Sequence, residues 1–356
     1  MIEPAMASDM AKASIMSSSS NSAQIRRRIL DRIEREAGVP NLVDTLSDRL
    51  VPTDLQSLLL EVYERRAKRR DPKALLSDHI SNRFTRPAAC DPAILLEWDR
   101  IAFSRLPKVF QIVELSPVCP LGTVSVVAPI SQDWTVSTSR NTEVVSDATN
   151  VLAIECAVRR FKQARSNPRA INPVHLAASH RLLRGQKFAT SPGIRQHFKV
   201  FSLCSAGRDS GNLRFETDTV GLHIRFYLEA MKEFLGVETQ LRVTIAEFDA
   251  EESRPSLRLA VFEKLESAFE DVRFEIGDQQ ADGSGYYRQM RFKIVTANAR
   301  GSDIELVDGG DVDWTQKLLN NAKERLIISG CGSERLCDLF GRTPNLKTTR
   351  RKFQEA

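Results

Sequence analysis

Apolar residues in the first part of the chain recur every three or four positions, the spacing that places side chains on one face of an α-helix. Pro40 and Pro52 stand where short helices would begin or end. We therefore predict a small helical N-terminal unit over residues 25–86. Residues 1–24 contain a serine run and little that could pack, so we expect a disordered tail there. The apolar positions of the helical pattern are Ile25, Ile29, Ile33, Leu55, Leu58, Leu59 and Val62.

The pattern changes near residue 87, where a proline-containing linker leads into a larger domain that we assign to residues 87–356. Asp91 followed by Pro92 is typical of a helix start, because an aspartate caps the free N–H groups and proline suits the first turn. The predicted helix has a buried stripe made of Ile94, Leu95, Trp98, Ile101 and Ala102.

Strand and helix patterns are mixed in the rest of this domain. Residues 240–248 and 287–295 alternate apolar and polar side chains as half-buried strands do, and residues 222–235 have a helical apolar stripe. The two patterns do not alternate regularly, which argues against a parallel sheet with crossover helices. We predict an α+β fold, an antiparallel sheet of about six strands flanked by helices.

The composition is that of a globular chain with a slightly basic balance. With 42% apolar and 27% charged residues, the 356-residue chain is not wholly disordered. A net charge of +5 is too small to indicate a nucleic-acid partner by itself. The segment Arg65–Lys73 has six basic side chains and one acid, Asp71. We interpret it as a solvated helix face, with contact to RNA, phosphate or a protein carrier as the alternative.

The cysteines and the hydropathy favour a reduced, cytoplasmic protein. The six cysteines form no CxxC pair and the five histidines show no HExxH spacing, so no metal site is expected. No stretch reaches the roughly 18 apolar residues that a membrane helix needs. The first residues contain no apolar core of a secretory signal.

Several short segments follow one another in an order that indicates the candidate chemistry. They are the helix from Asp91 with the extended run that ends at Pro117, and residues 144–149, 180–186, 198–207, 283–287, 308–313 and 327–336. This succession resembles the catalytic core of class II aminoacyl-tRNA synthetases, in the histidyl-tRNA synthetase branch. The resemblance covers roughly residues 91 to 340.

Three of these segments resemble motifs of that family. Leu183-Arg184-Gly185-Gln186 is similar to the second motif, Phe-Arg-x-Glu. Tyr286-Tyr287 resembles the paired tyrosines of the histidine-binding signature. The segment Gly330-Leu336, with Gly332, Glu334 and Arg335, is similar to the third motif.

The resemblance implies an ATP site, with Mg²⁺ as the accompanying ion. Arg184 and Arg335 would hold the triphosphate and stabilise the charge that builds on the α-phosphate, and Arg184 and Arg335 would be the catalytic residues. Arginine suits both roles, because it stays charged and its planar fork binds two oxygens at once. The other residues implied at the ATP site are Gln186, Phe198, Gly330 and Gly332.

The resemblance also implies a homodimer, formed through the helix from Asp91 and the segment that ends at Pro117. Trp98 and Phe103 are large apolar groups suited to an interface core. The chain ends about 20 residues after Arg335, so we expect no anticodon-binding domain of this family.

Departures from the family pattern change the expected substrate. Gln186 replaces the glutamate of the second motif, and Ile194, Gln196 and His197 stand where that motif's loop has arginines and a glutamate. The implied substrate pocket, which is too apolar or wrongly charged to bind histidine, consists of Asp147, Thr149, Val200, Cys204, Asp282, Tyr286 and Tyr287.

Three functions remain open from the sequence. The first is an ATP-dependent enzyme that activates a carboxylate or amino acid other than histidine as an adenylate. The second is a non-catalytic paralogue that binds a ligand or regulates a partner, as the synthetase-like subunit of ATP phosphoribosyltransferase does. The third is an RNA-binding accessory protein built around the basic N-terminal helices.

Overall fold

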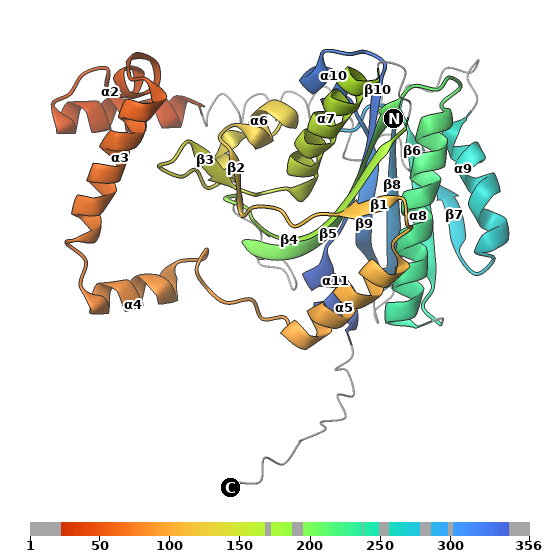
Figure 1. Ribbon diagram of the computed structural model, residues 1–356. Coiled ribbons are helices and arrows are strands. Elements are labelled where there is room, and N and C mark those ends of the chain that lie inside the picture. Colours follow the sequence, from red (N-terminus) through yellow and green to blue (C-terminus); the bar gives the residue numbers. More distant parts are fainter. Residues whose placement is uncertain are drawn as a thin grey trace, which may run out of the picture. The chain divides into compact units, whose positions relative to one another are not determined.

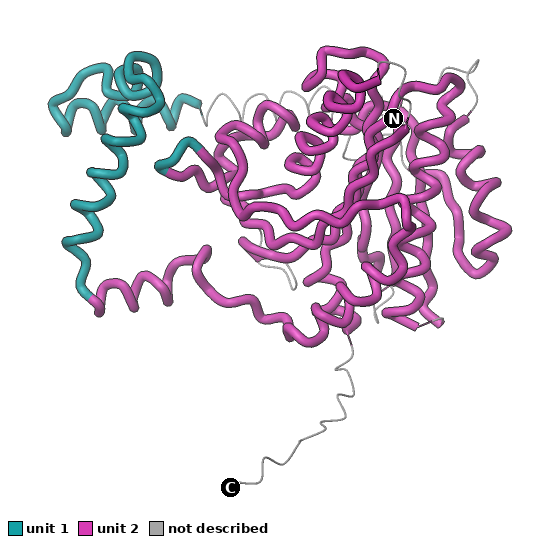
Figure 2. Tube along the Cα trace, viewed as in Figure 1, with its two compact units in different colours: residues 1–71, 139–141 teal, residues 72–138, 142–356 magenta. Residues whose placement is uncertain are grey.

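The computed structural model describes residues 23–167, 172–186, 195–236, 238–248, 256–277, 286–297 and 302–341. Residues 1–22 of the tail expected over residues 1–24 and the candidate pocket residue Asp282 lie outside these ranges, while residues 23 and 24 begin a helix. The chain divides into one compact unit of residues 1–71 with 139–141 and a second of residues 72–138 with 142–356 (Figure 2).

The first unit is helical, in line with the spacing of its apolar residues. A helix over residues 23–37 is followed by α2 (Leu42–Asp44), a π-helical turn (Thr45–Arg49) and α3 (Pro52–Ala67). None of the residues described in this unit is buried. The next helix, α4 (Pro72–Ser81), belongs to the second unit, and our division of the chain at residue 86 stays a prediction.

An eight-stranded mixed sheet forms the centre of the second unit (Figure 1). In spatial order its strands are β1 (Phe110–Ile112), β4 (Val174–Leu183), β5 (His197–Arg208), β10 (Glu324–Cys331), β9 (Asp303–Val312), β8 (Met290–Ala297), β6 (Leu241–Glu247) and β7 (Arg273–Ile276). The six strands from β4 to β6 pair antiparallel, while β1 and β7 pair in parallel at the two edges. The predicted α+β fold is confirmed. The two additional edge strands have three and four residues, too few for an alternating pattern.

Helices cover both faces of this sheet. One face, which we call the α8 face, packs against α5 (Pro92–Arg105), α8 (Arg214–Leu235), α9 (Leu257–Leu265) and α11 (Ser333–Phe340). The other, the α7 face, packs against α6 (Thr123–Val127), α7 (Ala148–Ser166) and α10 (Trp314–Leu319). The remaining elements are β2 (Val118–Pro120), β3 (Thr142–Val144) and two short 3₁₀ turns, Gln132–Trp134 and Glu266–Ala268.

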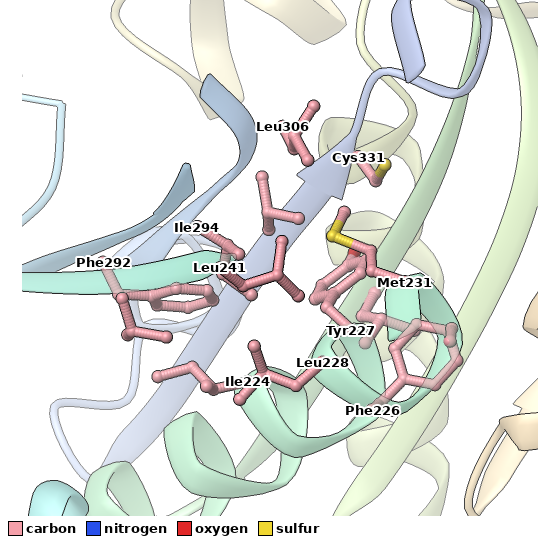
Figure 3. Close-up of a cluster of buried hydrophobic side chains, with 14 of the residues drawn as sticks. Ile224, Phe226, Tyr227, Leu228, Met231, Leu241, Phe292, Ile294, Leu306 and Cys331 are labelled. Carbon is pink, nitrogen blue, oxygen red and sulfur yellow. The ribbon is translucent and has the colours of Figure 1, made fainter. Parts of the chain in front are cut away.

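The α8 face carries the larger hydrophobic core. Figure 3 shows Phe226, Tyr227 and Met231 of α8 packed near side chains from β6, β8, β9 and β10. The α5 helix starts as predicted: Asp91 accepts a hydrogen bond from the Ala93 backbone N–H at 2.9 Å, and Pro92 stands in the first turn. The stripe on α8 was also predicted, although the helix begins at Arg214 rather than near Leu222.

Trp98 corrects one expectation. Its side chain is fully buried within its own chain, where its indole N–H donates to the Ser333 hydroxyl at 3.0 Å and its ring meets Phe201 and Phe234 edge-on. Phe103 packs partly buried against the same core. Trp98 is therefore not available for an interface, and the homodimer rests on the resemblance and stays a prediction.

Paired polar groups tie the helices to the sheet. Arg160 of α7 binds Glu324 of β10 through two hydrogen bonds of 2.9 Å, with both side chains almost completely buried. On the α8 face, His223 joins the hydroxyls of Ser205 and Ser329, each at 2.8 Å. Burial lowers the pKa of His223 well below its usual value, so this imidazole is neutral.

Candidate functional site

A cavity of about 560 Å³ opens on the α7 face, within the second unit. Its floor comes from β5, β10 and β9, because the strand register aligns Ser202, Gly330 and Asp308 in one row across the sheet. The N-terminus of α7, the end of β4, the start of α11 and the residues before β8 form the walls. A Cβ atom at Gly330 would lie 3.3 Å from Val200 Cγ1, so the glycine keeps the floor open.

Most of the residues predicted for the site come together here. Ten of the thirteen line the cavity: Asp147, Thr149, Arg184, Phe198, Val200, Tyr286, Tyr287, Gly330, Gly332 and Arg335. They come from segments up to 188 positions apart, Asp147 to Arg335. The cavity volume is within the range of about 300 to 1,000 Å³ that is typical of small-molecule sites.

Gln186 and Cys204 do not line the cavity. The Gln186 carbonyl accepts a hydrogen bond from Arg83, and its side-chain oxygen is buried without a hydrogen-bond partner among the described residues. Cys204 is fully buried behind the first turn of α7, where its thiol donates to the Thr149 carbonyl at 3.4 Å. Burial raises the pKa of this thiol well above its usual value. Both residues are therefore corrected from ligand contacts to supporting positions.

Arg335 brings a buried, unpaired donor to the cavity. It lies in the first turn of α11, where Leu336 packs into the core on the α8 face while Arg335 lines the cavity. Its Nε atom is buried and finds no hydrogen-bond partner in the part of the chain that the structure describes. A buried donor left unpaired costs about 1 to 3 kcal/mol, which a ligand acceptor would offset.

Arg184 is held in place by three contacts. Its Nε donates to the Ser146 carbonyl at 3.0 Å, and its Nη2 lies 3.5 Å from Asp147 Oδ2. The guanidinium carbon is 5.2 Å from the centre of the Phe198 ring. Asp147 caps α7 by accepting from the Thr149 N–H at 2.9 Å, so one carboxylate orients both the helix and the arginine.

The sequence did not predict a polar group at the β8–β9 side of the cavity. Arg291 Nε donates to Asp308 Oδ1 at 2.6 Å, and the Tyr287 hydroxyl donates to Asp308 Oδ2 at 3.0 Å. Burial raises the pKa of Asp308, and the hydrogen bond from Arg291 opposes that shift. Segment 308–313 and Tyr287 were singled out from the sequence, whereas Arg291 was signalled only as a charged residue between two buried positions of a strand.

The two tyrosines are fixed, neutral phenols. Burial raises the pKa of both Tyr286 and Tyr287 well above the usual value, so each hydroxyl keeps its proton. Tyr287 packs on Gly310 of β9, where a Cβ atom would lie 2.6 Å from its ring and 2.3 Å from the Met290 carbonyl. Only glycine fits at position 310, which explains how the ring reaches the cavity.

Arg195 adds a further cation that the sequence placed only near the second motif. Its exposed side chain makes no hydrogen bond or ion pair within the described ranges.

Across the described ranges, no cluster of three or more histidine, cysteine, aspartate or glutamate side chains is arranged to hold a metal ion. A search of the same residues finds no helix with the length and hydrophobicity to cross a bilayer.

The chain is similar to known proteins in its structure rather than in its sequence. No protein-family model matches the chain, and no curated protein sequence matches it. Among solved structures, a Bacillus halodurans protein described as an ATP phosphoribosyltransferase regulatory subunit/histidyl-tRNA synthetase aligns with a TM-score of 0.51 and 15% identity. The alignment covers 73% of this chain and 84% of that one. This chain has a class II synthetase-like fold.

Two further structures are similar over less of their length. The RNA-binding domain of threonyl-tRNA synthetase from Cryptosporidium parvum aligns with a TM-score of 0.51 and 11% identity, covering 69% of this chain and 62% of that chain. Apo histidyl-tRNA synthetase from S. aureus aligns with a TM-score of 0.47 and 14% identity, covering 68% and 63%. The chain thus spans less than two thirds of either protein, and at these identities the likeness concerns the fold alone.

Proposed function

We propose that the cavity binds ATP with Mg²⁺ and activates a small carboxylate or amino acid other than histidine as an adenylate. The observation that carries this proposal is the buried, unpaired Nε of Arg335 in a cavity that also contains Arg184 and Arg195. Charge-assisted hydrogen bonds from arginine to phosphate are among the strongest that a site can offer. A Mg²⁺ ion that accompanies ATP would be held chiefly by the phosphates and water.

The chemistry assigns different tasks to the two arginines. A substrate carboxylate oxygen attacks the α-phosphorus, the bond to the bridging oxygen breaks, and pyrophosphate leaves. Arg184 would hold the α-phosphate, where charge grows in the transition state, and Arg335 the far end of the triphosphate. Phe198, whose ring already lies against Arg184, would offer a surface for the adenine.

Val200 of β5 and Asp308 of β9 support a substrate other than histidine. Val200 offers no acceptor to an imidazole N–H, and Asp308 is already engaged by Arg291 and Tyr287. A selective site rejects a ligand that leaves its buried polar groups unpaired. We expect no histidine binding at micromolar concentration, and calorimetry with histidine tests this directly.

The function is tested by ATP affinity, measured with and without Mg²⁺, and by pyrophosphate exchange across a panel of amino acids and small carboxylates. Arg335→Ala should weaken ATP binding roughly 30-fold or more, because losing one partner of a desolvated charged contact costs about 2 to 5 kcal/mol. Arg184→Ala should reduce exchange more than binding. Lysine should rescue either poorly, since an ammonium lacks the fork.

Arg100→Ala is the matched control. This arginine pairs with Glu97 on the surface of α5 and does not line the cavity, so ATP affinity should not change. Wild-type protein that binds no ATP at millimolar nucleotide would refute the enzyme. Unchanged ATP affinity in Arg335→Ala would mean that the third-motif resemblance is structural only.

A non-catalytic, ligand-binding role in regulation is the second candidate. It is favoured by Arg184, which Ser146 and Asp147 already engage, and by Gln186, which lies outside the cavity. It is also in keeping with the fold likeness to a protein described as a regulatory subunit. Nucleotide binding without pyrophosphate exchange for any tested acid would favour this role over the enzyme.

Partners remain part of the proposal. A homodimer is expected because the helix from Asp91 and the segment that ends at Pro117 resemble the family's dimer-forming elements. Light scattering that gives a 40 kDa particle at micromolar concentration would contradict it.

RNA or a protein carrier is the alternative partner for Arg65–Lys73. Within that segment Arg65 and Lys68 pair with Glu61 and Glu64 one turn earlier and are largely exposed, which favours a solvated face.

A further inference from the structure

A short segment far from the motifs contacts the antiparallel pair β4 and β5, which borders the candidate site and is called the β4–β5 hairpin below. Residues 82–86 follow α4 and lie, like the hairpin, in the second unit. Arg83 Nη2 donates to the Gly185 carbonyl at 2.6 Å, and its Nη1 donates to the Gln186 carbonyl at 3.0 Å and to Gln196 Oε1 at 2.9 Å. One guanidinium therefore bridges the end of β4 and the residue before β5, more than 100 positions away in the sequence.

The arginine is itself held in place. Its guanidinium carbon lies 4.5 Å from the centre of the Phe84 ring, and the Phe84 N–H donates to Asn82 Oδ1 at 3.0 Å. A second contact runs from the same segment to β5, where His197 Nε2 lies 2.5 Å from the Arg86 carbonyl. Stacking on an aromatic ring and a planar fork make arginine a well-oriented, multidentate donor.

The three acceptors adjoin the residues that would bind ATP. Gly185 follows Arg184, and its N–H donates to the Trp134 carbonyl at 2.7 Å. The Arg184 N–H donates to the Gln196 carbonyl at 2.7 Å, which closes the two arms of the hairpin on each other. A Cβ atom at Gly185 would lie 2.9 Å from the Asp133 carbonyl, so the backbone here has little room to shift.

We infer that Arg83 is a positioning residue that clamps the β4–β5 hairpin and so holds Arg184 and Phe198 in the geometry needed for ATP. Arg83 does not line the cavity and acts only through the hairpin. The inference rests on the proposed function for its ligand, whereas the clamp itself is a property of the free protein. All three acceptors are neutral, so the position of the donors, rather than the added charge, produces the effect.

The test compares Arg83→Ala and Arg83→Lys with wild-type full-length protein. Amide hydrogen exchange at Arg184 and Gly185 reports the order of the hairpin without any ligand, and calorimetry reports ATP affinity. Loss of three hydrogen bonds from a charged donor should raise exchange at both amides about tenfold or more and weaken ATP binding about tenfold. The thermal midpoint should stay within about 2 °C, since the core is untouched.

Arg86→Ala is the matched control. Among the described residues, the Arg86 side chain donates from Nε to the Ile80 carbonyl of α4 at 3.1 Å and does not contact the hairpin. Its backbone contact with His197 survives the substitution. It should leave exchange and ATP affinity unchanged. Arg83→Lys should resemble Arg83→Ala, because one ammonium cannot reach three acceptors spread over both arms.

Several outcomes would overturn the inference. Unchanged exchange in Arg83→Ala would show that the hairpin does not depend on the clamp. Wild-type behaviour of Arg83→Lys would assign the effect to charge, and a fall of about 10 °C in the midpoint would assign it to global stability. If wild-type protein binds no ATP, the proposed function fails, and the exchange data still decide whether Arg83 orders the hairpin.

Discussion

The two faces of the central sheet are built from the same strands but are covered differently. On the α8 face, four helices cover a large hydrophobic core that includes a paired polar side chain, His223, which contacts Ser205 and Ser329. On the α7 face, α7 covers only part of the strands, and the rest forms a cavity with charged side chains. The larger core therefore lies on the α8 face and the candidate site on the α7 face. We expect substitutions in the core to change stability and substitutions in the cavity to change ligand binding.

Two arginines with buried donors, Arg160 and Arg335, differ in whether those donors are paired. Arg160 directs its guanidinium at Glu324, with a further hydrogen bond from Nη1 to the Asn172 carbonyl at 3.1 Å. Arg335 has a buried Nε that no described residue satisfies. The first arginine is part of the fold, whereas the second has donors left for a ligand.

The largest expected effect is on the α8 face. Trp98→Ala should lower the free energy of unfolding by about 3 to 5 kcal/mol, because it removes a fully buried indole and leaves a cavity between Phe201 and Phe234. Leu96→Ala on the same helix, where the side chain is 70% exposed, should change it by less than about 0.5 kcal/mol. Denaturant unfolding measures both, and equal effects would contradict the placement of Trp98 in the core of the α8 face.

The buried ion pair gives the next effect. Arg160→Ala should cost about 3 to 4 kcal/mol, because Glu324 would remain buried without its counter-charge. Arg159→Ala is a control on the adjacent residue of α7. Arg159 forms a partly exposed pair with Glu155 and should cost at most about 1 kcal/mol. A small loss of stability in Arg160→Ala would show that water reaches Glu324 once the arginine is removed.

Much of the fold could be predicted because its signals are local. The capped start of α5 at Asp91 and Pro92, the α8 stripe and the alternation in β6 are each contained in one segment of sequence. The site was only partly predictable for the same reason. Val200, Ser202 and Cys204 share one face of β5, yet which part of that face α7 covers depends on tertiary packing.

The missed residues all depend on contacts between distant segments. Arg291 and Asp308 meet across two neighbouring strands, and a shift of register by one residue would separate them. Arg83 meets Gly185 across 102 positions, and nothing in the local pattern of residues 82–86 indicates that contact. Motif resemblance could not reveal these contacts either, because one partner of each, Arg291 or Arg83, lies outside the motifs.

The pH dependence of stability tests whether burial of the Asp311 carboxyl group disfavours its charged form in the folded protein. Burial raises the pKa of Asp311 from 3.8 to about 6, although its Oδ1 accepts from the Gln289 and Met290 N–H groups at 2.8 Å. The folded protein then binds this proton more tightly than the unfolded chain does. The contribution to stability is complete below pH 4 and is lost as the pH rises through 6.

Asp311→Asn keeps an oxygen that can accept both N–H bonds and removes the ionisation. The variant should be more stable than wild type by about 3 kcal/mol at pH 7 and by less than about 1 kcal/mol near pH 4. Unfolding measured across this range checks the sign. A variant that is less stable at pH 7 would mean that the charged carboxylate is stabilising in the folded protein, contrary to the direction of its pKa.

No loss of stability is expected at Arg335, where the largest loss of binding is expected. Arg335→Met removes a buried donor that has no partner among the described residues, so the free energy of unfolding should not fall and should rise by up to about 1 to 3 kcal/mol. Millimolar ATP should stabilise the wild type by an amount that grows with ligand concentration and should stabilise the variant far less. A loss of about 3 kcal/mol in the absence of ligand would instead place Arg335 with Arg160 among the structural arginines. The contrast between the two arginines would then be wrong, and with it the main reason to regard the cavity as an anion site.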